Sequence, residues 1–438
     1  MHTNISLLLT LLDLAPQLQC DLGTRWPEVC KSLLTLAGRL ANEGDTLSIR
    51  RDLDSLLDEL FAILPETSSA TLRSKLQDLH REAADQPSRL RAFGEQDRLT
   101  GDREPESNDA IIVPVFYGTD RKRSDTPLSP YCGRWGDQDF GVAEVSVPVG
   151  TKFRAIGELS SPKWWRLEFN PDTKKHVVLL NVRQLARETF IAELRDGLAT
   201  ADRRDALIFV HGYNVSFDDA ARRAAQLAVD LKFPGRTLLY SWSSSGLPQN
   251  YIMDEETIEW STPHFEEFLQ LAVTEVGADS IHLLAHSMGN RALVDALSRF
   301  NARALPPGSA HLQQVIFAAP DVNAGVFRQH AARFQHHAER FTLYASSTDL
   351  ALKVSKLIHG HPRAGDVGDT PLIVDGIDTI DATTVDTSLL GLKHSYFGDK
   401  RSVLNDIFGL VQDGHEPKKR FDLTAAISSA GAYWLYRP

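Results

Sequence analysis

The pentapeptide from Ala285 to Gly289, Ala-His-Ser-Met-Gly, sets a serine between two small residues. This spacing is typical of a nucleophile elbow, a sharp strand-to-helix turn that strains the serine backbone and exposes its hydroxyl at the end of a sheet. Ala285 and Gly289 are the small types that such a turn requires, because the residues flanking the serine approach each other closely. The apolar run Ile281–Leu284 precedes the turn, and the good helix formers of Arg291–Leu297 follow it. Ser287 is therefore the candidate nucleophile.

A serine hydroxyl becomes an effective nucleophile when a histidine accepts its proton and a carboxylate orients that histidine. In the order Ser, Asp, His, the chain offers Asp349, which ends the run Phe341–Thr348, and His394, which precedes an expected helix at 403–411. Asp321 is the alternative acid because it follows the preceding predicted strand. We favour Asp349, since the acid of such a fold usually follows the later strand and a Pro-Asp pair is often only a turn or a helix cap.

The tetrahedral intermediate of acyl transfer also needs preorganised hydrogen-bond donors for its oxyanion. The backbone N–H of Met288 is one candidate, because it follows the nucleophile at the start of a helix. Gly212 or Tyr213 is the second, since both follow the predicted strand Ile208–Val210 in the sequence His-Gly-Tyr-Asn. A glycine there lets the backbone approach closely, although a turn alone would also call for one.

Aromatic residues near these positions are candidates for an acyl or alcohol pocket. They are Trp242, Tyr251 and Phe217, and a place in the hydrophobic core is an equally ordinary interpretation of each. Asp254 has two interpretations as well, because it could orient a polar substrate or cap the helix that follows it.

Alternating strand and helix patterns surround these residues and predict the sheet that positions them. The expected strands are 206–210, 237–242, 280–285, 314–319 and 340–345, and the helices between them include 218–231, 262–276 and 290–300. Near-continuous apolar strands separated by amphipathic helices imply a mostly parallel, doubly wound α/β sheet. Shorter β-rich runs at 111–117, 142–147 and 176–182 precede this pattern, and a strand at 372–374 is expected within a polar-faced hairpin. Residues 110–438 are thus expected to form one α/β domain.

Residues 1–85 carry helical periodicity instead. Leu53, Leu57, Leu60 and Leu64 recur on one face of a helix, and similar patterns near 5–18, 26–40 and 72–79 complete a small helical bundle domain. Residues 86–109 are rich in charged and polar types with few large apolar ones, so they are expected to form a linker.

Several of these motifs together resemble one known family. From about Ile111 to Gly409 the chain is similar to the bacterial α/β-hydrolases called domain of unknown function 900. The similarity is carried by Val113–Asp120, Val210–Asn214, Tyr240–Trp242 and Ala285–Asn290, with Ala319–Val322 and Asp378–Asp381. The resemblance implies an α/β-hydrolase fold with a serine-centred site, and it favours Ser287, Asp349 and His394 as the triad. It implies no substrate, and it does not cover the N-terminal helical region.

Composition excludes several other classes of protein. The chain of 438 residues has a net charge of −11, which repels polyanions, so nucleic-acid binding is not expected as the main role. Two short basic runs, Arg121-Lys122-Arg123 and Lys418-Lys419-Arg420, are interpreted as solvated loop charges. No apolar run approaches the roughly 20 residues that span a bilayer, so no integral membrane segment is expected.

The cysteine and histidine patterns exclude the common metal sites. The chain has 3 cysteines, without the spacing of a disulfide framework or a metal cluster, which favours a reducing, cytoplasmic location. His336-His337 and the pair His359 and His361 lack a ligand spacing completed by a carboxylate. No metal ion or cofactor is therefore expected.

These observations predict a serine hydrolase of the carboxylesterase or lipase type, acting on a small-molecule or lipid ester through an acyl-enzyme. A thioesterase or acyltransferase would use the same residues, and a non-catalytic interaction scaffold would share the fold. The helical domain is a candidate surface for a protein partner or for self-association.

Overall fold

The computed structural model describes residues 47–64, 110–126, 129–149, 172–245, 251–385, 403–420 and 422–436, with scattered positions between 8 and 39 and between 72 and 79. The chain divides into two compact units. One comprises residues 1–107 with 353–360, and the other comprises residues 108–352 with 361–438. The expected linker at 86–109 and the candidate base His394 both lie outside the described residues.

In the first unit, helix α3 (Leu47–Ile63) is described over its whole length. Leu53, Leu57 and Leu60 are fully buried along one side of it, as their spacing predicts. The scattered described positions on either side are mostly helical, and their leucines, among them Leu11, Leu33 and Leu76, are also fully buried. The outward side of α3 carries charged residues such as Arg50 and Asp54, which form an ion pair one helical turn apart.

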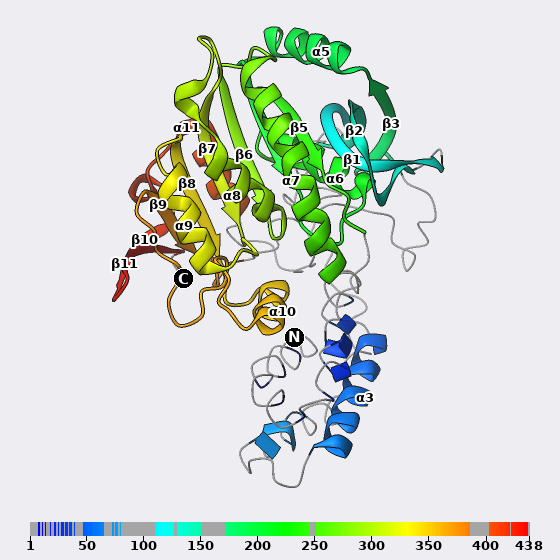
Figure 1. The fold of residues 1–438 in the computed structure, drawn as a ribbon, viewed down its shortest axis with the longest axis vertical. Helices are drawn as coiled ribbons and strands as arrows, with labels where there is room; N and C mark the ends of the chain where they lie inside the picture. Colours follow the sequence, from blue (N-terminus) through cyan, green and yellow to red (C-terminus); the bar gives the residue numbers. More distant parts are fainter. Residues whose placement is uncertain are drawn as a thin grey trace, which may run out of the picture. The chain divides into compact units, whose positions relative to one another are not determined.

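The second unit is built on a large sheet (Figure 1). Its described strands are β1 (Ala110–Thr126), β2 (Ser129–Pro148), β3 (Val178–Leu185), β4 (Asp205–Val210), β5 (Arg236–Ser241), β6 (Ser280–His286), β7 (His311–Ala318), β8 (Ala338–Ala345), β9 (Ile377–Asp381), β10 (Leu423–Ser428) and β11 (Gly431–Tyr436). They lie in the order β10-β11-β9-β8-β7-β6-β4-β5-β1-β2-β3. Neighbours from β11 to β1 run parallel, whereas β2 is antiparallel to β1 and β3, and β10 is antiparallel to β11.

Helices connect these strands and cover both faces of the sheet. They are α5 (Arg187–Ala199), α6 (Phe217–Asp230), α7 (Tyr251–Thr274), α8 (Gly289–Arg299), α9 (Ala324–Phe334) and α11 (Val403–Asp413), with short 3₁₀ turns η4 (Ala302–Ala304) and η5 (Pro417–Lys419). Helix α10 (Leu350–His359) follows β8, and its residues from Lys353 onward belong to the first unit. α7, α8 and α9 lie on the same side of the sheet, toward the viewer in Figure 1. This arrangement is the mostly parallel, doubly wound α/β sheet that the sequence predicts.

Adjacent residues of each strand point to opposite faces of the sheet, so each strand packs against the helices on both faces. Ile316 of β7 joins a core cluster with residues of α6 and α11, such as Leu227 and Ile407. Its neighbour Phe317 instead packs against Phe327 of α9, with ring centroids 5.1 Å apart. The buried parts of the central strands are therefore mostly apolar on both faces, because helices cover the sheet on both sides.

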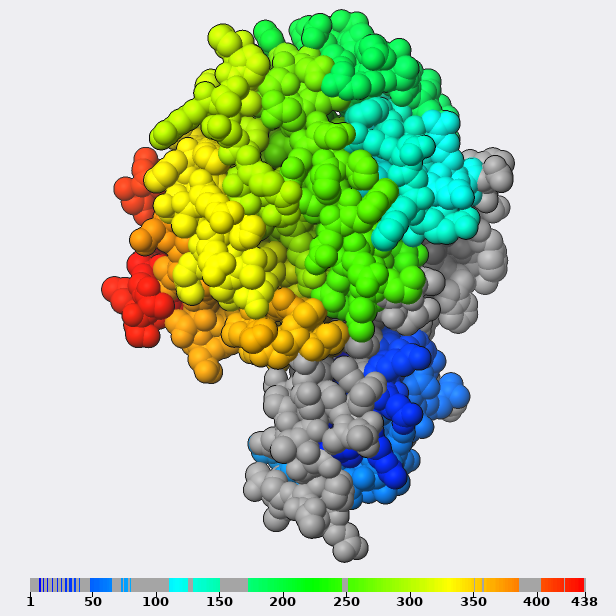
Figure 2. Space-filling view, in the orientation of Figure 1, coloured from blue at the N-terminus to red at the C-terminus, as the bar shows by residue number. Residues whose placement is uncertain are grey.

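The hairpin of β1 and β2 extends beyond the sheet and packs against α7. Trp135 of β2 stacks on Trp260 of α7 with centroids 4.9 Å apart and planes 5° from parallel, and its indole N–H donates to the Thr257 hydroxyl. Figure 2 shows the cyan surface of this hairpin adjoining the green surface of α7. The hairpin thus fixes α7 at the edge of the parallel sheet.

Two of the expected elements differ from the observed ones. α7 begins at Tyr251 rather than at residue 262, and it carries Pro263 in its interior. The strand that follows β8 is β9 at Ile377–Asp381 rather than a strand at 372–374. Val374 forms only an isolated bridge to Ile377 across a tight turn, so the expected hairpin strand is wrong.

The basic runs also differ from their interpretation as solvated charges. Arg121 lies in β1 with only 1% of its surface exposed, and Arg420 is 5% exposed and forms an ion pair with Asp406. Lys122 is exposed, as expected. Arg121 and Lys122 therefore lie on opposite faces of β1, because successive side chains of a strand point to opposite faces. Among the described helices, none is both long and apolar enough to cross a membrane.

Candidate active site

Ser287 lies in a sharp turn between β6 and α8. Its φ is +49°, in the left-handed region that non-glycine residues avoid at a cost of roughly 1–3 kcal/mol. The side chain is 6% exposed at the carboxyl end of a central strand. This is the conformation of the nucleophile elbow predicted from Ala285 and Gly289.

Hydrogen bonds on three sides hold the elbow in its strained form. The Ser287 N–H donates to the Ala318 carbonyl at 2.9 Å, and the Ser287 carbonyl accepts from the N–H groups of Asn290 and Asp321, both at 3.1 Å. The side-chain amide of Asn290 also donates to the carbonyls of Ser287 and Ala318, at 3.0 and 3.2 Å. Asn290 is fully buried, and the sequence analysis gave it no role.

The loop after β4, residues 211–216, which we call the glycine loop, lies directly against this turn. A Cβ built on Gly212 would be 3.0 Å from the Ser287 Cβ, and one built on Gly289 would be 2.3 Å from the His211 carbonyl oxygen. Only glycine at these two positions allows the two backbones to come so close. The Gly212–Tyr213 segment predicted to supply an oxyanion donor is therefore adjacent to the candidate nucleophile.

Buried groups fix the start of that loop. Trp242 is fully buried, stacks on the His211 ring at 5.2 Å and donates from its indole N–H to the His211 carbonyl at 2.8 Å. The His211 ring nitrogen Nδ1 lies 2.7 Å from the Gly212 carbonyl oxygen. Arg121 reaches the other ring nitrogen, Nε2, at 3.3 Å. Burial first, and then the Arg121 charge, hold the pKa of His211 well below its usual value.

Asp254 fixes the other end of the loop. Its carboxylate accepts from the Ser244 hydroxyl at 2.6 Å, from the Ser245 N–H at 2.9 Å and from the Asn214 N–H at 3.3 Å. Asn214 has a φ of +57°, so this contact stabilises a residue in the left-handed region. Burial raises the pKa of Asp254 above its usual value, while these hydrogen bonds oppose that shift. Asp254 lies within α7 rather than before a helix, so the expectation that it caps a following helix is wrong, and its observed contacts are with the loops after β4 and β5.

Asp349 lies in the loop between β8 and α10, at the same edge of the sheet as Ser287. One of its carboxylate oxygens accepts from the Leu352 N–H at 3.1 Å and so caps α10. The pKa of the Tyr213 phenol is raised first by burial and then by the charge of Asp349, which lies near it. Asp349 is thus close to the loop that contacts Ser287.

Asp321, the alternative acid, is held by other side chains. It pairs with Arg291 at 3.5 Å and with Arg363 at 3.4 Å, and it accepts the Tyr251 hydroxyl. Arg291 also binds Glu255 at 2.5 Å, which ties α8 to α7. These contacts give Asp321 a structural role beside the elbow.

The candidate pocket residues occupy different environments. Phe217 is fully buried in the core against Tyr117 and Tyr131, at centroid distances of 4.9 and 4.7 Å. Tyr251 packs its ring edge against Tyr213 at 5.2 Å, beside the loop that contacts Ser287. The structure therefore brings Tyr251 and Tyr213 together and places Phe217 within the core.

Comparisons with known proteins agree with this geometry. The sequence profile of "Alpha/beta hydrolase of unknown function (DUF900)" matches residues 186–410, just over half of the chain. The chain belongs to this family.

The DUF900 match includes Gly212, Ser287, Asp349 and His394. The matched residues begin after β3. The hairpin of β1 and β2 therefore lies outside the match, although the resemblance of motifs extends to it. The fold is accordingly that of an α/β-hydrolase, and the family is one of hydrolases.

Other comparisons add little. No curated protein matches the sequence. A solved structure described as "the putative cell surface hydrolase from Lactobacillus plantarum WCFS1" aligns at 13% identity and a TM-score of 0.27, covering 48% of this chain and 91% of that one.

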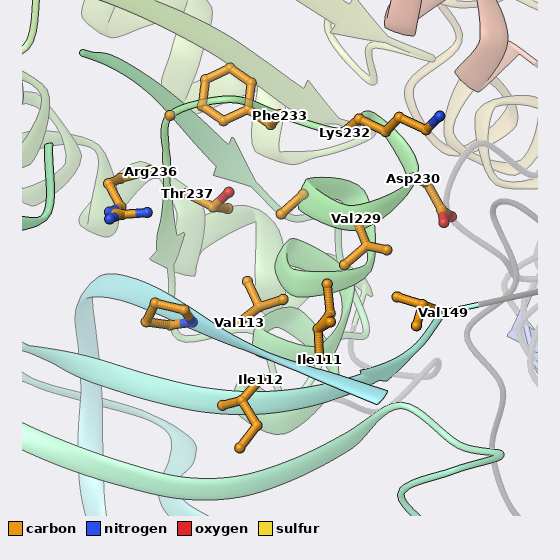
Figure 3. A pocket seen from close by; sticks show the side chains of 13 residues that line it. Ile111, Ile112, Val113, Val149, Val229, Asp230, Lys232, Phe233, Arg236 and Thr237 are labelled. Carbon is orange, nitrogen blue, oxygen red and sulfur yellow. The ribbon is translucent and has the colours of Figure 1, made fainter. Parts of the chain in front are cut away.

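A hollow of about 560 Å³ lies elsewhere on this DUF900 domain (Figure 3). Its walls include Ile111 and Val113 of β1, Val229 of α6, Phe233 in the turn after α6, and Arg236, the first residue of β5. It lies at the amino ends of β1 and β5, whereas the elbow follows the carboxyl end of β6 in the same mostly parallel sheet, so the hollow is not part of the site around Ser287. Within the described residues, no group of three His, Cys, Asp or Glu side chains could hold a metal ion.

Proposed function

We propose that this DUF900 protein is a serine hydrolase that cleaves a carboxylic ester through an acyl-enzyme on Ser287. The observation that carries the proposal is the left-handed backbone of Ser287, held by three backbone partners beside a glycine loop. Strain of this kind persists where it serves a function, and here it presents a hydroxyl at the end of a central strand.

The oxyanion donors are the N–H groups of Met288 and Tyr213. The His211 carbonyl oxygen points toward the Gly289 position, so the Gly212 N–H of the same trans peptide points away from the elbow. The Gly212 carbonyl points to the His211 ring, which leaves the Tyr213 N–H on the opposite side of its peptide. Tyr213 is therefore a better donor than Gly212 in this arrangement.

In the proposed reaction the Ser287 hydroxyl oxygen attacks the ester carbonyl carbon while His394 accepts the hydroxyl proton. Asp349 orients His394 and stabilises its charged form. The intermediate collapses when the C–O bond to the alcohol breaks and the histidine returns its proton to the leaving alcohol. Water then attacks the acyl-enzyme with the same proton transfers, which releases the carboxylic acid and restores Ser287.

Turnover of a panel of p-nitrophenyl esters and acyl thioesters of increasing chain length tests this proposal. The wild type should hydrolyse at least one ester, and Ser287→Ala should lower kcat by about 10³-fold or more. Ser298→Ala is the matched control, because Ser298 lies in α8 and its hydroxyl donates to the Asp295 carbonyl within the helix. This control should keep the wild-type kcat.

The panel also separates the alternatives. Preferential turnover of thioesters, or transfer to an added alcohol in competition with water, would replace the esterase by a thioesterase or an acyltransferase that uses the same residues. Equal rates for the wild type and Ser287→Ala would overturn the proposal and favour a non-catalytic scaffold.

A further inference from the structure

Arg121 is a buried cation that lacks a carboxylate within hydrogen-bonding distance among the described residues. Its guanidinium donates to the Ser241 hydroxyl at 2.9 Å, to the Ser244 carbonyl at 2.8 Å and to the Val215 carbonyl at 2.7 Å. Its fourth contact, 3.3 Å long, is with Nε2 of His211. A fully buried charge is costly unless its hydrogen bonds serve the fold or the site, so the target of each bond matters.

The four contacts join three segments at the carboxyl edge of the sheet. Arg121 belongs to β1, and Ser241 ends β5 while Ser244 follows it. His211 and Val215 lie at the two ends of the loop after β4. That loop contains Gly212 and Tyr213. Arg121 therefore acts on the segment that carries the proposed oxyanion donor, although its own strand is two places away from β4 in the sheet.

The partners of the His211 ring determine its protonation. A guanidinium only donates hydrogen bonds, so Nε2 must be the acceptor of the contact with Arg121. The Ser241 hydroxyl, which accepts from Arg121, lies 3.3 Å from the same nitrogen and can donate to it. A carbonyl oxygen only accepts, so Nδ1 must carry the proton that it shares with the Gly212 carbonyl. His211 is consequently neutral and in the Nδ1–H form. The Arg121 charge and the nearby His286 ring both oppose a second proton on it.

This tautomer has a direct effect on the next peptide. The Nδ1–H group holds the Gly212 carbonyl on the side of the His211 ring at 2.7 Å. Because the peptide is planar and trans, the Tyr213 N–H must point to the other side. In the opposite tautomer, Nδ1 and the Gly212 oxygen would both be acceptors and would repel each other, so the peptide would be free to rotate.

Building on the proposed function, we infer that Arg121 is a positioning residue of the oxyanion hole. Directly, and through the Ser241 hydroxyl that it orients, it keeps His211 in the Nδ1–H form. His211 in turn orients the Gly212–Tyr213 peptide so that the Tyr213 N–H faces the intermediate. The other three bonds of Arg121 stabilise the loops themselves, and the test must separate that structural contribution from the control of the tautomer.

A double-mutant cycle on kcat makes this separation. Arg121→Met should lower kcat by about 10- to 100-fold with KM changed by less than about 3-fold, because a donor to the transition state is misplaced. His211→Asn keeps a donor at the position of Nδ1 that has no tautomer, so it should stay within about 10-fold of the wild type. In the His211→Asn background, Arg121→Met should then cost less than about 3-fold. The same fold-loss in both backgrounds would overturn the inference.

Two controls accompany the cycle. Arg123→Met removes an exposed arginine of the same strand, whose partner is Asp139, and should leave kcat unchanged. Urea unfolding reports whether each variant is folded at the assay temperature. If Arg121→Met does not fold, Arg121→Lys retains the charge with fewer donors and should show the same pattern in the cycle with smaller factors.

Nuclear magnetic resonance of the full chain labelled with ¹⁵N-histidine provides a readout that is independent of catalysis. The His211 resonances, assigned by their absence in His211→Asn, should show the neutral Nδ1–H form in the wild type and a different or mixed form in Arg121→Met. An unchanged tautomer in Arg121→Met would contradict the inference. A wild type that hydrolyses no substrate but shows this tautomer switch would refute the proposed function, and with it the catalytic consequence, while the link between Arg121 and His211 would stand.

Discussion

Gly212 lies so close to Ser287 that a Cβ built on the glycine would be 3.0 Å from the Cβ of the serine. The two residues are 75 positions apart in sequence and belong to loops after neighbouring parallel strands, β4 and β6. The proximity of Gly212 and Ser287 brings the glycine loop against the strained serine. Arg121 and Asp254 contact the same loop, so the loop and the serine are both linked to a buried polar network.

Gly212→Ala should weaken catalysis more than folding. The added methyl would also lie 3.0 Å from Nδ1 of His286, so the loop must shift by a few tenths of an ångström and move the oxyanion donor. We expect kcat to fall by about 10- to 100-fold with little change in KM, measured by steady-state ester hydrolysis. In the control Gly409→Ala, on α11, nothing lies within 4 Å of the new Cβ, so kcat should not change. Wild-type kcat in Gly212→Ala would contradict a role of this loop in catalysis.

The two candidate acids should respond differently to the same substitution. Asp349→Asn should lower kcat by about 10³- to 10⁴-fold and leave the free energy of unfolding nearly unchanged, because this carboxylate orients the base. Asp321→Asn should instead reduce the free energy of unfolding by about 3 kcal/mol, since it removes the charge that faces the buried Arg291 and Arg363. Urea unfolding and ester turnover measure the two effects. The reverse result would make Asp321 the acid of the triad.

The stability of the second unit should depend on pH through Asp218. Burial is the main cause that raises the pKa of this carboxyl to about 6, and its Oδ1 has no hydrogen-bond partner within the described part of the chain. The folded state thus binds this proton more tightly than the unfolded state, so its contribution to stability falls as the pH rises from about 4 to about 6. Asp218→Asn removes that loss.

Urea unfolding at two pH values checks this prediction. Asp218→Asn should raise the free energy of unfolding by about 1 kcal/mol at pH 7.5, a value reduced for the partial exposure of the group, and should change it little at pH 4. Asp202→Asn, in an exposed turn, is the control and should have no effect at either pH. An equal change at both pH values would show that the effect does not come from the ionisation of Asp218.

Sequence periodicity predicted most of the central sheet because its strands are covered on both faces. β4 is apolar after its first residue, β6 and β8 are mostly apolar, and the elbow follows β6. Local sequence alone therefore located Ser287 and the glycine loop. The expected triad partner His394 lies outside the described residues, so its role stays a prediction.

The start of α7 was predicted wrongly because a local sequence pattern indicated one boundary, whereas contacts with residues distant in the sequence determine another. Thr262-Pro263 has the pattern of a helix start, since proline suits the first turn, but α7 begins at Tyr251, whose hydroxyl binds Asp321 from a distant loop. The Thr262 hydroxyl instead bonds the Ile258 carbonyl within the helix at 2.8 Å. Tertiary contacts of Tyr251 and Asp254 thus extend the helix past a residue that usually marks its start.

Arg121 was missed for a similar reason. In sequence it is the first of three consecutive basic residues, which usually face solvent, and nothing nearby predicts a partner. Its acceptors lie about 90 to 123 positions away, in the loops after β4 and β5. The guanidinium reaches the glycine loop only because β1 pairs in parallel with β5 in the folded sheet.

Intact-mass labelling with a fluorophosphonate tests the central claim most directly, because the reagent reacts with a serine only when a neighbouring base and an oxyanion hole activate it. We expect one adduct per wild-type chain and the same adduct in the Ser298→Ala control. Ser287→Ala and His394→Ala should show none. Absence of labelling in the folded wild type, or retained labelling in Ser287→Ala, would contradict the assignment of Ser287 as an activated nucleophile.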